Sequence, residues 1–282
     1  MSEEFLMVTD ERSNLEKLLD KQGITEKEAI TAIKSGAGFN PGKVERLGIS
    51  GRHFKYGYFS DSHIGHKEFK PELFDKMKRM FDKESIDFII SIGDTLEGMS
   101  GRDGHVYELT HIGFNQQINY AAGLLNQLKQ PIYGIDGNHD GWYKIKGNGG
   151  VVVGEELQNR VKNYTHIGEM EGIIKPVKNV EMKLFHANDG SAYATSYKLQ
   201  KLVESFSGGE KPHIVHSGHY HKALYAFIRN VHGFESGTLC GQTPFMRGKK
   251  IQAHMGFGIV DVYHNKDGVD RIIHEFIPGY EK

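Results

Sequence analysis

Acidic, amide and imidazole side chains recur in this sequence within five short segments. In chain order the segments read DSH (61–63), GDTLE (93–97), GNHD (137–140), LFH (184–186) and GHYH (218–221). Carboxylate, amide oxygen and imidazole groups without thiolate suit borderline ions such as Mn²⁺, Fe²⁺ or Zn²⁺. Two residues separated by one position point to the same side of an extended chain, so His219 and His221 are spaced to hold one ion. Asp61 and His63 have the same spacing.

The number of candidate ligands indicates two ions rather than one. Seven side chains qualify: Asp61, His63, Asp94, Asn138, His186, His219 and His221. Seven ligands are too many for one tetrahedral ion, but they are adequate for two adjacent ions that share an aspartate. Such a pair activates water and holds the oxygens of a phosphate ester during in-line displacement. The single cysteine, Cys240, is interpreted as a small buried apolar side chain.

Each early segment directly follows an apolar run of strand character. The patterns predict strands over 54–59, 86–92 and 131–135, and helices over 71–83 and 116–129. A strand–helix–strand–helix–strand order favours parallel pairing with crossover helices. Because ligands of open α/β sheets collect at the carboxyl ends of the strands, we expect the segments to converge there.

The later part of the chain is richer in predicted strands. They fall at 182–185, 213–215, 226–231, 258–263 and 271–276, and the last two flank a hairpin-like turn over 264–268. The segments LFH and GHYH each end one of these strands. All five segments are therefore expected at strand ends.

Residues 1–50 are predicted to lie outside the main domain, which we assign to residues 51–282. Residues 12–36 have the pattern of a helical hairpin, followed by a glycine- and proline-containing linker over 36–51. A DNA-binding helix-turn-helix is the alternative. The second helix carries Glu26 and Glu28 beside Lys27 and Lys34, without excess positive charge, so a packing hairpin is favoured.

Composition limits the partner classes. With a formal net charge of −1, the chain has no global field for a polyanion, so nucleic-acid binding would rest on a local patch. No apolar run approaches the roughly 20 residues of a membrane span, and the acidic N-terminus lacks signal-peptide character. We therefore expect a cytoplasmic protein without a membrane partner.

In this order the five segments resemble the D-x-H, GD-x-x-D/E, GNH-D/E, H and GH-x-H pattern of the calcineurin-like metallophosphoesterases. The resemblance covers about residues 54–221 and implies an α/β fold, a two-sheet β-sandwich flanked by helices, preceded here by the short N-terminal helical hairpin. It implies these ligands: Asp61, His63 and His221 for one divalent ion, Asn138, His186 and His219 for the other, and Asp94 as the bridge. It also implies that His139 acts as an acid at the phosphoryl group and that Glu97 orients His139.

The sequence departs from the family pattern at two positions. Ala187 follows His186 where glycine is usual, and Glu97 replaces the commoner aspartate. The forms GDTLEGM and GNHD argue against the protein Ser/Thr phosphatases. GNHD with GHYH looks more like the phosphodiesterase and DNA-repair-nuclease branch, including phage-encoded members.

The leading hypothesis is therefore a two-metal phosphoesterase that uses a metal-bridging hydroxide, with a phosphodiester of nucleic acid or nucleotides as substrate. The alternatives are a phosphomonoesterase acting on small molecules or phosphoproteins, and a DNA-binding adaptor with a non-catalytic metal fold. The substrate-binding residues are not determined. If this branch applies, Trp142 or Tyr143 is a candidate to stack a base, and the candidates for phosphate contacts are Arg102, Lys144, Lys146 and Arg247; the alternative favoured for any single one is a solvated loop residue or a core aromatic. His66 is kept as a candidate substrate-side residue, and no catalytic role is assigned to His66, His105 or His111.

Overall fold

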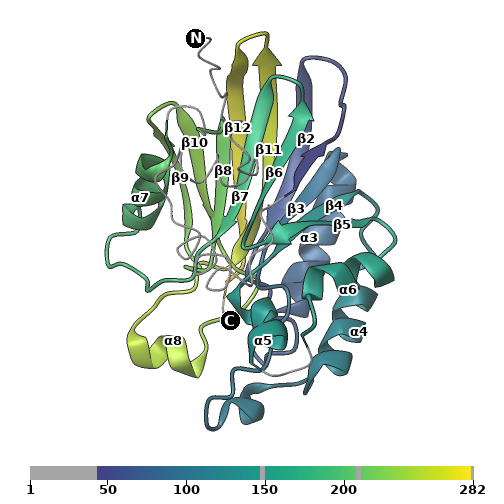
Figure 1. The fold of residues 1–282 in the computed structure, drawn as a ribbon, viewed down its shortest axis with the longest axis vertical. Coiled ribbons are helices and arrows are strands. Elements are labelled where there is room, and N and C mark those ends of the chain that lie inside the picture. Colours follow the sequence, from purple (N-terminus) through teal and green to yellow (C-terminus); the bar gives the residue numbers. More distant parts are fainter. Residues whose placement is uncertain (1–42, 147–149, 208–210, 281–282) are drawn as a thin grey trace, which may run out of the picture. The chain divides into compact units, whose positions relative to one another are not determined.

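Two six-stranded sheets form the centre of the computed structural model, which describes residues 43–146, 150–207 and 211–280 (Figure 1). From edge to edge the first sheet contains β1 (Val44–Arg46), β6 (Glu171–Val177), β7 (Val180–His186), β8 (Ile214–Gly218), β10 (Val231–Ser236) and β9 (Ala223–Ile228). The second contains β12 (Gly268–Pro278), β11 (Gly256–Asn265), β2 (His53–Phe59), β3 (Phe88–Ile92), β4 (Ile132–Asp136) and β5 (Tyr164–Glu169). The predicted hairpin over 12–36 lies outside the described residues.

Helices cover the outer faces of both sheets. The helices are α3 (Pro71–Glu84), η1 (His105–Glu108), α4 (Phe114–Leu125), α5 (Asn138–Ile145), α6 (Val153–Arg160), α7 (Tyr197–Ser205) and α8 (Pro244–Lys249). Apolar side chains of α3, α4 and α6 pack on the second sheet, and those of α7 pack on the first. A further core fills the space between the sheets. This arrangement confirms the α/β fold with a two-sheet sandwich flanked by helices.

The prediction of parallel pairing is confirmed for β2, β3 and β4. Tyr56 pairs with Phe88, and Ile89 pairs with Ile132, with α3 and α4 as the crossovers. All five residues of β3 are buried, as expected for a strand covered on both faces. The carboxyl ends of these three strands therefore meet at one edge of the sheet.

The sequence accounts for the limits of α3. Pro71 occupies the first turn, where its missing N–H costs no hydrogen bond, and the helix stops at Ser85 in the left-handed conformation with φ 51°. Leu73, Phe74 and Met77 repeat at helical spacing and are buried. Burial of that face holds α3 against the second sheet.

Two sequence-based expectations for the first sheet were wrong. The continuous strand expected over 226–231 is divided between β9 and β10, because Arg229 and Asn230 have positive φ and form a tight turn. The predicted linker over 36–51 contains β1, whose residue Val44 pairs with Ile173 of β6. The turn between β11 and β12 is confirmed, with Asn265 paired with Gly268.

No helix within the described ranges is long and apolar enough to cross a membrane.

Glu235 on β10 is a buried carboxylate in the first sheet. It is 1% exposed, and neither oxygen accepts a hydrogen bond of normal geometry from the described residues. Burial raises its pKa to about 7, although the nearby ammonium of Lys222 acts in the opposite direction. The folded chain therefore holds this proton more tightly than the unfolded chain, whose glutamate pKa is about 4.3.

We predict that Glu235→Gln stabilises the protein above pH 7 by about 1–3 kcal/mol and has little effect near pH 4.5. Between these pH values the folded state binds more protons than the unfolded state, so wild-type stability falls as pH rises. The glutamine variant lacks this dependence. Urea unfolding at pH 5 and pH 8 measures it, and an equal effect at both pH values would contradict the role given to Glu235.

Candidate metal centre

The carboxyl ends of strands from both sheets meet at one place. Asp61 follows β2, Asp94 follows β3 and Asn138 follows β4, while His186 ends β7 and the GHYH segment follows β8. A hydrogen bond from His186 Nδ1 to the carbonyl of Ile92, 2.7 Å long, joins β7 of the first sheet to β3 of the second. All five segments predicted to converge are therefore adjacent.

One group of candidate ligands comprises Asp61, His63 and His221. Their ligand atoms lie within 4.8 Å of one another. The two Nε2 atoms of His63 and His221 face each other at 3.0 Å, and Asp61 Oδ1 lies 3.3 Å from His221 Nε2. His63 Nδ1 is hydrogen-bonded to the Glu97 carboxylate at 2.8 Å, which leaves the lone pair of Nε2 directed to the group.

The second group comprises Asp94, His186 and His219, with Asn138 between the rings. Asn138 Oδ1 lies 2.8 Å from His219 Nδ1 and 3.2 Å from His186 Nε2. The other ring nitrogens donate elsewhere, His186 Nδ1 to Ile92 and His219 Nε2 to the carbonyl of Asp189. His219 therefore presents a nitrogen lone pair to the oxygen of Asn138, an arrangement that a cation resolves. Burial lowers the pKa of His186, but Asp94 outweighs it and raises the pKa to about 10, so this ring carries a proton where a cation would bind.

Asp94 lies between the two groups. Its Oδ2 is 3.3 Å from His186 Nε2 and 3.9 Å from His63 Nε2, while Oδ1 accepts the backbone N–H of His139 at 2.8 Å. Burial alone raises the pKa of Asp94, but His186 and the other surrounding histidines outweigh it and hold the pKa far below its usual range. An ionised carboxylate in this position fits a shared ligand.

The donor set fits two divalent ions. Ligand atoms at about 2.1 Å from one ion are separated from each other by about 3.0–3.4 Å, close to the spacings observed here. The Nδ1 atom of His221 is buried without a hydrogen-bond partner in the described part of the chain. Buried polar atoms in proteins normally have a partner, so this one points to a partner that is not protein, such as water or an ion. The seven predicted ligands are all present in the two groups or between them.

Backbone strain is concentrated at the same residues. Ten non-glycine residues within the described ranges have positive φ, and five are candidate ligands: Asp61 (49°), His63 (49°), Asp94 (49°), His219 (87°) and His221 (54°). Each such residue costs on the order of 1–3 kcal/mol and persists only where its surroundings enforce it. The concentration is typical of ligand clamps.

His139 lies beside both groups. Its Nδ1 donates to the Glu97 backbone carbonyl at 2.8 Å, and its ring stacks on Trp142 with centroids 3.9 Å apart. Burial lowers the pKa of His139, but the carboxylates of Asp94 and Glu97 overcome this and raise it to about 9. With no cation bound, the imidazole is therefore charged at neutral pH and suited to donate to an anion.

The Glu97 carboxylate contacts three histidines, whereas the sequence analysis expected it to orient His139. Its carboxylate lies 2.8 Å from His63 Nδ1, 2.7 Å from His105 Nε2 and 3.5 Å from His139 Nδ1. It therefore orients His63 at least as directly as His139. His105 was given no catalytic role in the sequence analysis. It lies in the glycine-rich insert over residues 98–113, and the neighbouring sequence does not indicate this contact.

Asp140 is a second residue whose role the sequence pattern did not reveal. Its buried carboxylate accepts the backbone N–H groups of Thr95, Leu96 and Gly137 at 2.9–3.1 Å. These hydrogen bonds fasten the GDTLE loop to the GNHD segment. Asp140 thus fixes the relative position of Asp94 and Asn138.

A cavity of about 620 Å³ opens beside the two ligand groups. Its walls include Arg102 and His105 from the glycine-rich insert, Trp142 of α5, and Phe245 and Met246 of α8; Lys146 and His66 also border it. α5 and α8 lie at the same end of the sheets (Figure 1). The cavity has the size of ordinary small-ligand sites.

Other residues proposed as substrate contacts lie elsewhere. Tyr143 is buried against Phe114 in the helical layer, and Lys144 pairs with Glu169 at 2.9 Å. The reason is that residues 138–145 form α5, so only one face of this segment reaches the cavity. His111 stacks on Tyr120 away from the cavity lining.

The sequence model of the calcineurin-like phosphoesterase superfamily domain matches residues 54–262. This match covers more than half of the chain and includes all five segments. The chain therefore belongs to the calcineurin-like phosphoesterase superfamily.

Two curated relatives are DNA polymerase II small subunits. The protein of Methanothermobacter thermautotrophicus is 23% identical over 256 residues, covering 74% of this chain and 52% of the relative. The protein of Archaeoglobus fulgidus is 24% identical over 264 residues, covering 78% and 53%. The chain thus spans about half the length of the curated relatives it matches.

Solved structures with a similar chain fold include an archaeal phosphodiesterase and a phosphoesterase of E. coli. The first is 15% identical with a TM-score of 0.48, covering 79% of this chain and 99% of that chain. The second is 13% identical with a TM-score of 0.42, covering 78% and 98%. The family assignment rests on the sequence match, not on these structures.

We predict that Gly137→Ala weakens metal binding about 10- to 100-fold. An added Cβ would lie 2.1 Å from Asp94 Oδ1 and 2.4 Å from Asp94 N, so the shared carboxylate must move. Metal content after dialysis measures the effect. Gly141→Ala is the matched control, because a Cβ there has open space within the same helix. Full metal content in the Gly137 variant would contradict the central position of Asp94.

Proposed function

We propose that this chain is a dinuclear-metal phosphodiesterase that hydrolyses nucleic acid or nucleotides. The observation that carries the proposal is the pair of ligand groups with the Asp94 carboxylate between them, beside the imidazole of His139. Two divalent ions held by these residues would supply Lewis acidity, to activate water and to neutralise phosphate charge.

In the proposed site each side chain has a distinct task. Asp61, His63 and His221 would hold one ion, Asn138, His186 and His219 the other, and Asp94 both. His139 would donate a hydrogen bond to a phosphoryl oxygen or a proton to the leaving group. Glu97 would keep His63 in the tautomer that presents Nε2 and would stabilise the charge on His139.

Two observations favour a substrate that contains a nucleotide, and the diester is distinguished from the monoester by the test below. The cavity combines Trp142 and Phe245 with the cations Arg102 and Lys146, which suits a base next to a phosphate. The curated relatives are named as DNA polymerase subunits, which favours a nucleic-acid context.

The same relatives support a second candidate function. The chain would then be a non-catalytic subunit or adaptor of a nucleic-acid enzyme, with the metal fold retained for structure. The intact ligand set and the position of His139 favour catalysis over this alternative. Hydrolysis of any ester by the purified chain separates the two.

The direct test offers the metal-loaded chain bis-p-nitrophenyl phosphate, p-nitrophenyl phosphate, and single- and double-stranded DNA. We expect hydrolysis of the diester and of DNA. Hydrolysis of the monoester alone would replace the proposal with a phosphomonoesterase. No hydrolysis with two metals bound would leave the adaptor function.

We predict that Asp94→Asn lowers diester hydrolysis by about 100-fold or more and weakens both metal sites, because the amide lacks the shared negative charge. Activity and metal stoichiometry are measured together. The metal-free variant should melt at a lower temperature than the metal-free wild type, because the Asp94 carboxylate is paired with His186, and its melting curve distinguishes loss of metal from loss of folding. An active variant with both metals would refute the bridging role.

We predict that His139→Ala lowers kcat about 10²- to 10⁴-fold while metal content stays close to wild type, since the acid rather than a ligand is removed. His111→Ala is the control, because that ring lies outside the cavity. The proposed role fails if His139→Ala releases metal or keeps its turnover.

A further inference from the structure

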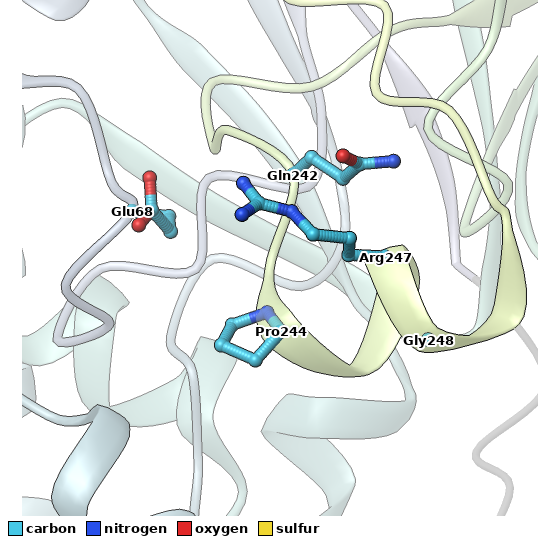
Figure 2. A pocket seen from close by; sticks show the side chains of 5 residues that line it. All are labelled: Glu68, Gln242, Pro244, Arg247 and Gly248. Atoms are coloured by element: carbon cyan, nitrogen blue, oxygen red, sulfur yellow. The ribbon is translucent and has the colours of Figure 1, made fainter.

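Residues of α8 border two hollows. Phe245 and Met246 face the cavity beside the ligand groups, whereas Pro244 and Arg247 border a second hollow of about 400 Å³. Figure 2 shows the Arg247 side chain extending beside Gln242, with Glu68 on the opposite wall. One short helix therefore contributes to both surfaces.

The outer side of this segment is strongly basic. Arg247, Lys249 and Lys250 are exposed, and none forms an ion pair with a carboxylate in the described part of the chain. Glu68, the acid bordering the second hollow, is paired with Lys70 at 3.0 Å. In a chain of net charge −1, three cations within four residues form a local site for anions.

The inner side of the segment offers an aromatic ring. Phe245 is 50% exposed at the cavity edge, and the Arg102 guanidinium lies 5.9 Å from its ring centroid. Arg102 is itself held by Glu108 at 2.8 Å. A half-exposed ring next to a fixed guanidinium is an arrangement on which nucleobases stack.

We propose that the segment Thr243–Lys250 binds a single-stranded nucleic acid that passes from the second hollow into the cavity. Phe245 stacks on a base next to the scissile phosphate, and Arg247, Lys249 and Lys250 contact phosphates of nucleotides outside the cavity. A cavity of about 620 Å³ accommodates a single nucleotide unit, so the bound form is a single strand. This proposal specifies the substrate of the proposed phosphodiesterase as a single-stranded nucleic acid, and it rests on that proposed function.

The test measures binding of a fluorescent phosphorothioate oligothymidylate, which resists hydrolysis, to the full metal-loaded chain at several salt concentrations. We expect Arg247→Gln/Lys249→Gln/Lys250→Gln to reduce the slope of log Kd against log salt by about 2, and affinity tenfold or more. The matched control is Lys162→Gln/Lys178→Gln/Lys266→Gln. These exposed lysines lie at the opposite ends of the strands from the metal centre, and their removal should leave the slope unchanged.

The aromatic contribution has its own variant. Phe245→Ala should lower oligothymidylate affinity about five- to hundredfold while leaving the salt slope unchanged, because stacking releases no counterions. Phe227→Ala is the control, since this ring is 58% exposed on β9, away from the cavity. Melting temperatures confirm that both variants are folded.

Each result decides the assignment. The proposal is wrong if the two triple variants have equal slopes or if the wild type does not bind oligothymidylate. It is also wrong if the α8 triple variant loses binding to poly-glutamate to the same extent. Hydrolysis of bis-p-nitrophenyl phosphate by the wild type is measured in parallel. Activity on this small diester without the expected binding changes refutes the α8 assignment alone, whereas the binding changes without any hydrolysis refute only the proposed activity.

Discussion

The contact between the ends of β7 and β3 is the constraint on which the rest of the site depends. The hydrogen bond from His186 Nδ1 to the Ile92 carbonyl requires the two sheets to approach without intervening side chains. A Cβ on Gly93 would lie 2.5 Å from His186 Nδ1, and one on Gly218 would lie 2.5 Å from the Ile92 oxygen. Because these two positions are glycine, ligands from both sheets reach the single carboxylate of Asp94.

The site is costly for the fold. Asp61 and Asp94 are almost completely buried, and five candidate ligands have left-handed backbone conformations. Buried charges and strained backbones persist only when other interactions over-determine them. Here the extensive apolar cores on both faces of the second sheet supply that support, and Asp140 fastens the two loops that carry Asp94 and Asn138. The rigid layers thus hold an arrangement that is unfavourable by itself.

Charged side chains of both signs line the cavity beside the ligand groups. Arg102 and Lys146 border it together with the carboxylates of Glu108 and Asp189, and Arg102 is held by Glu108 at 2.8 Å. Aromatic side chains line the same cavity. An anionic ligand that enters would therefore meet cations and rings at one wall of the cavity.

The sequence by itself determined the family, the seven candidate ligands and the parallel order of β2, β3 and β4, because apolar periodicity reports local burial and each segment follows a strand. Tertiary structure decided the contact of His105 with Glu97, the formation of α5, which takes Tyr143 and Lys144 away from the cavity, and the turn that divides β9 from β10. It also decided that Arg247 borders the second hollow, whereas Arg102 borders the cavity beside the ligand groups. Such contacts depend on how the two sheets pack and on which loops then lie side by side. Local sequence patterns do not contain that information. Asp61 and His63 are only part of the candidate site. His221 and Asp94, which follow other strands, lie beside them only in the folded chain.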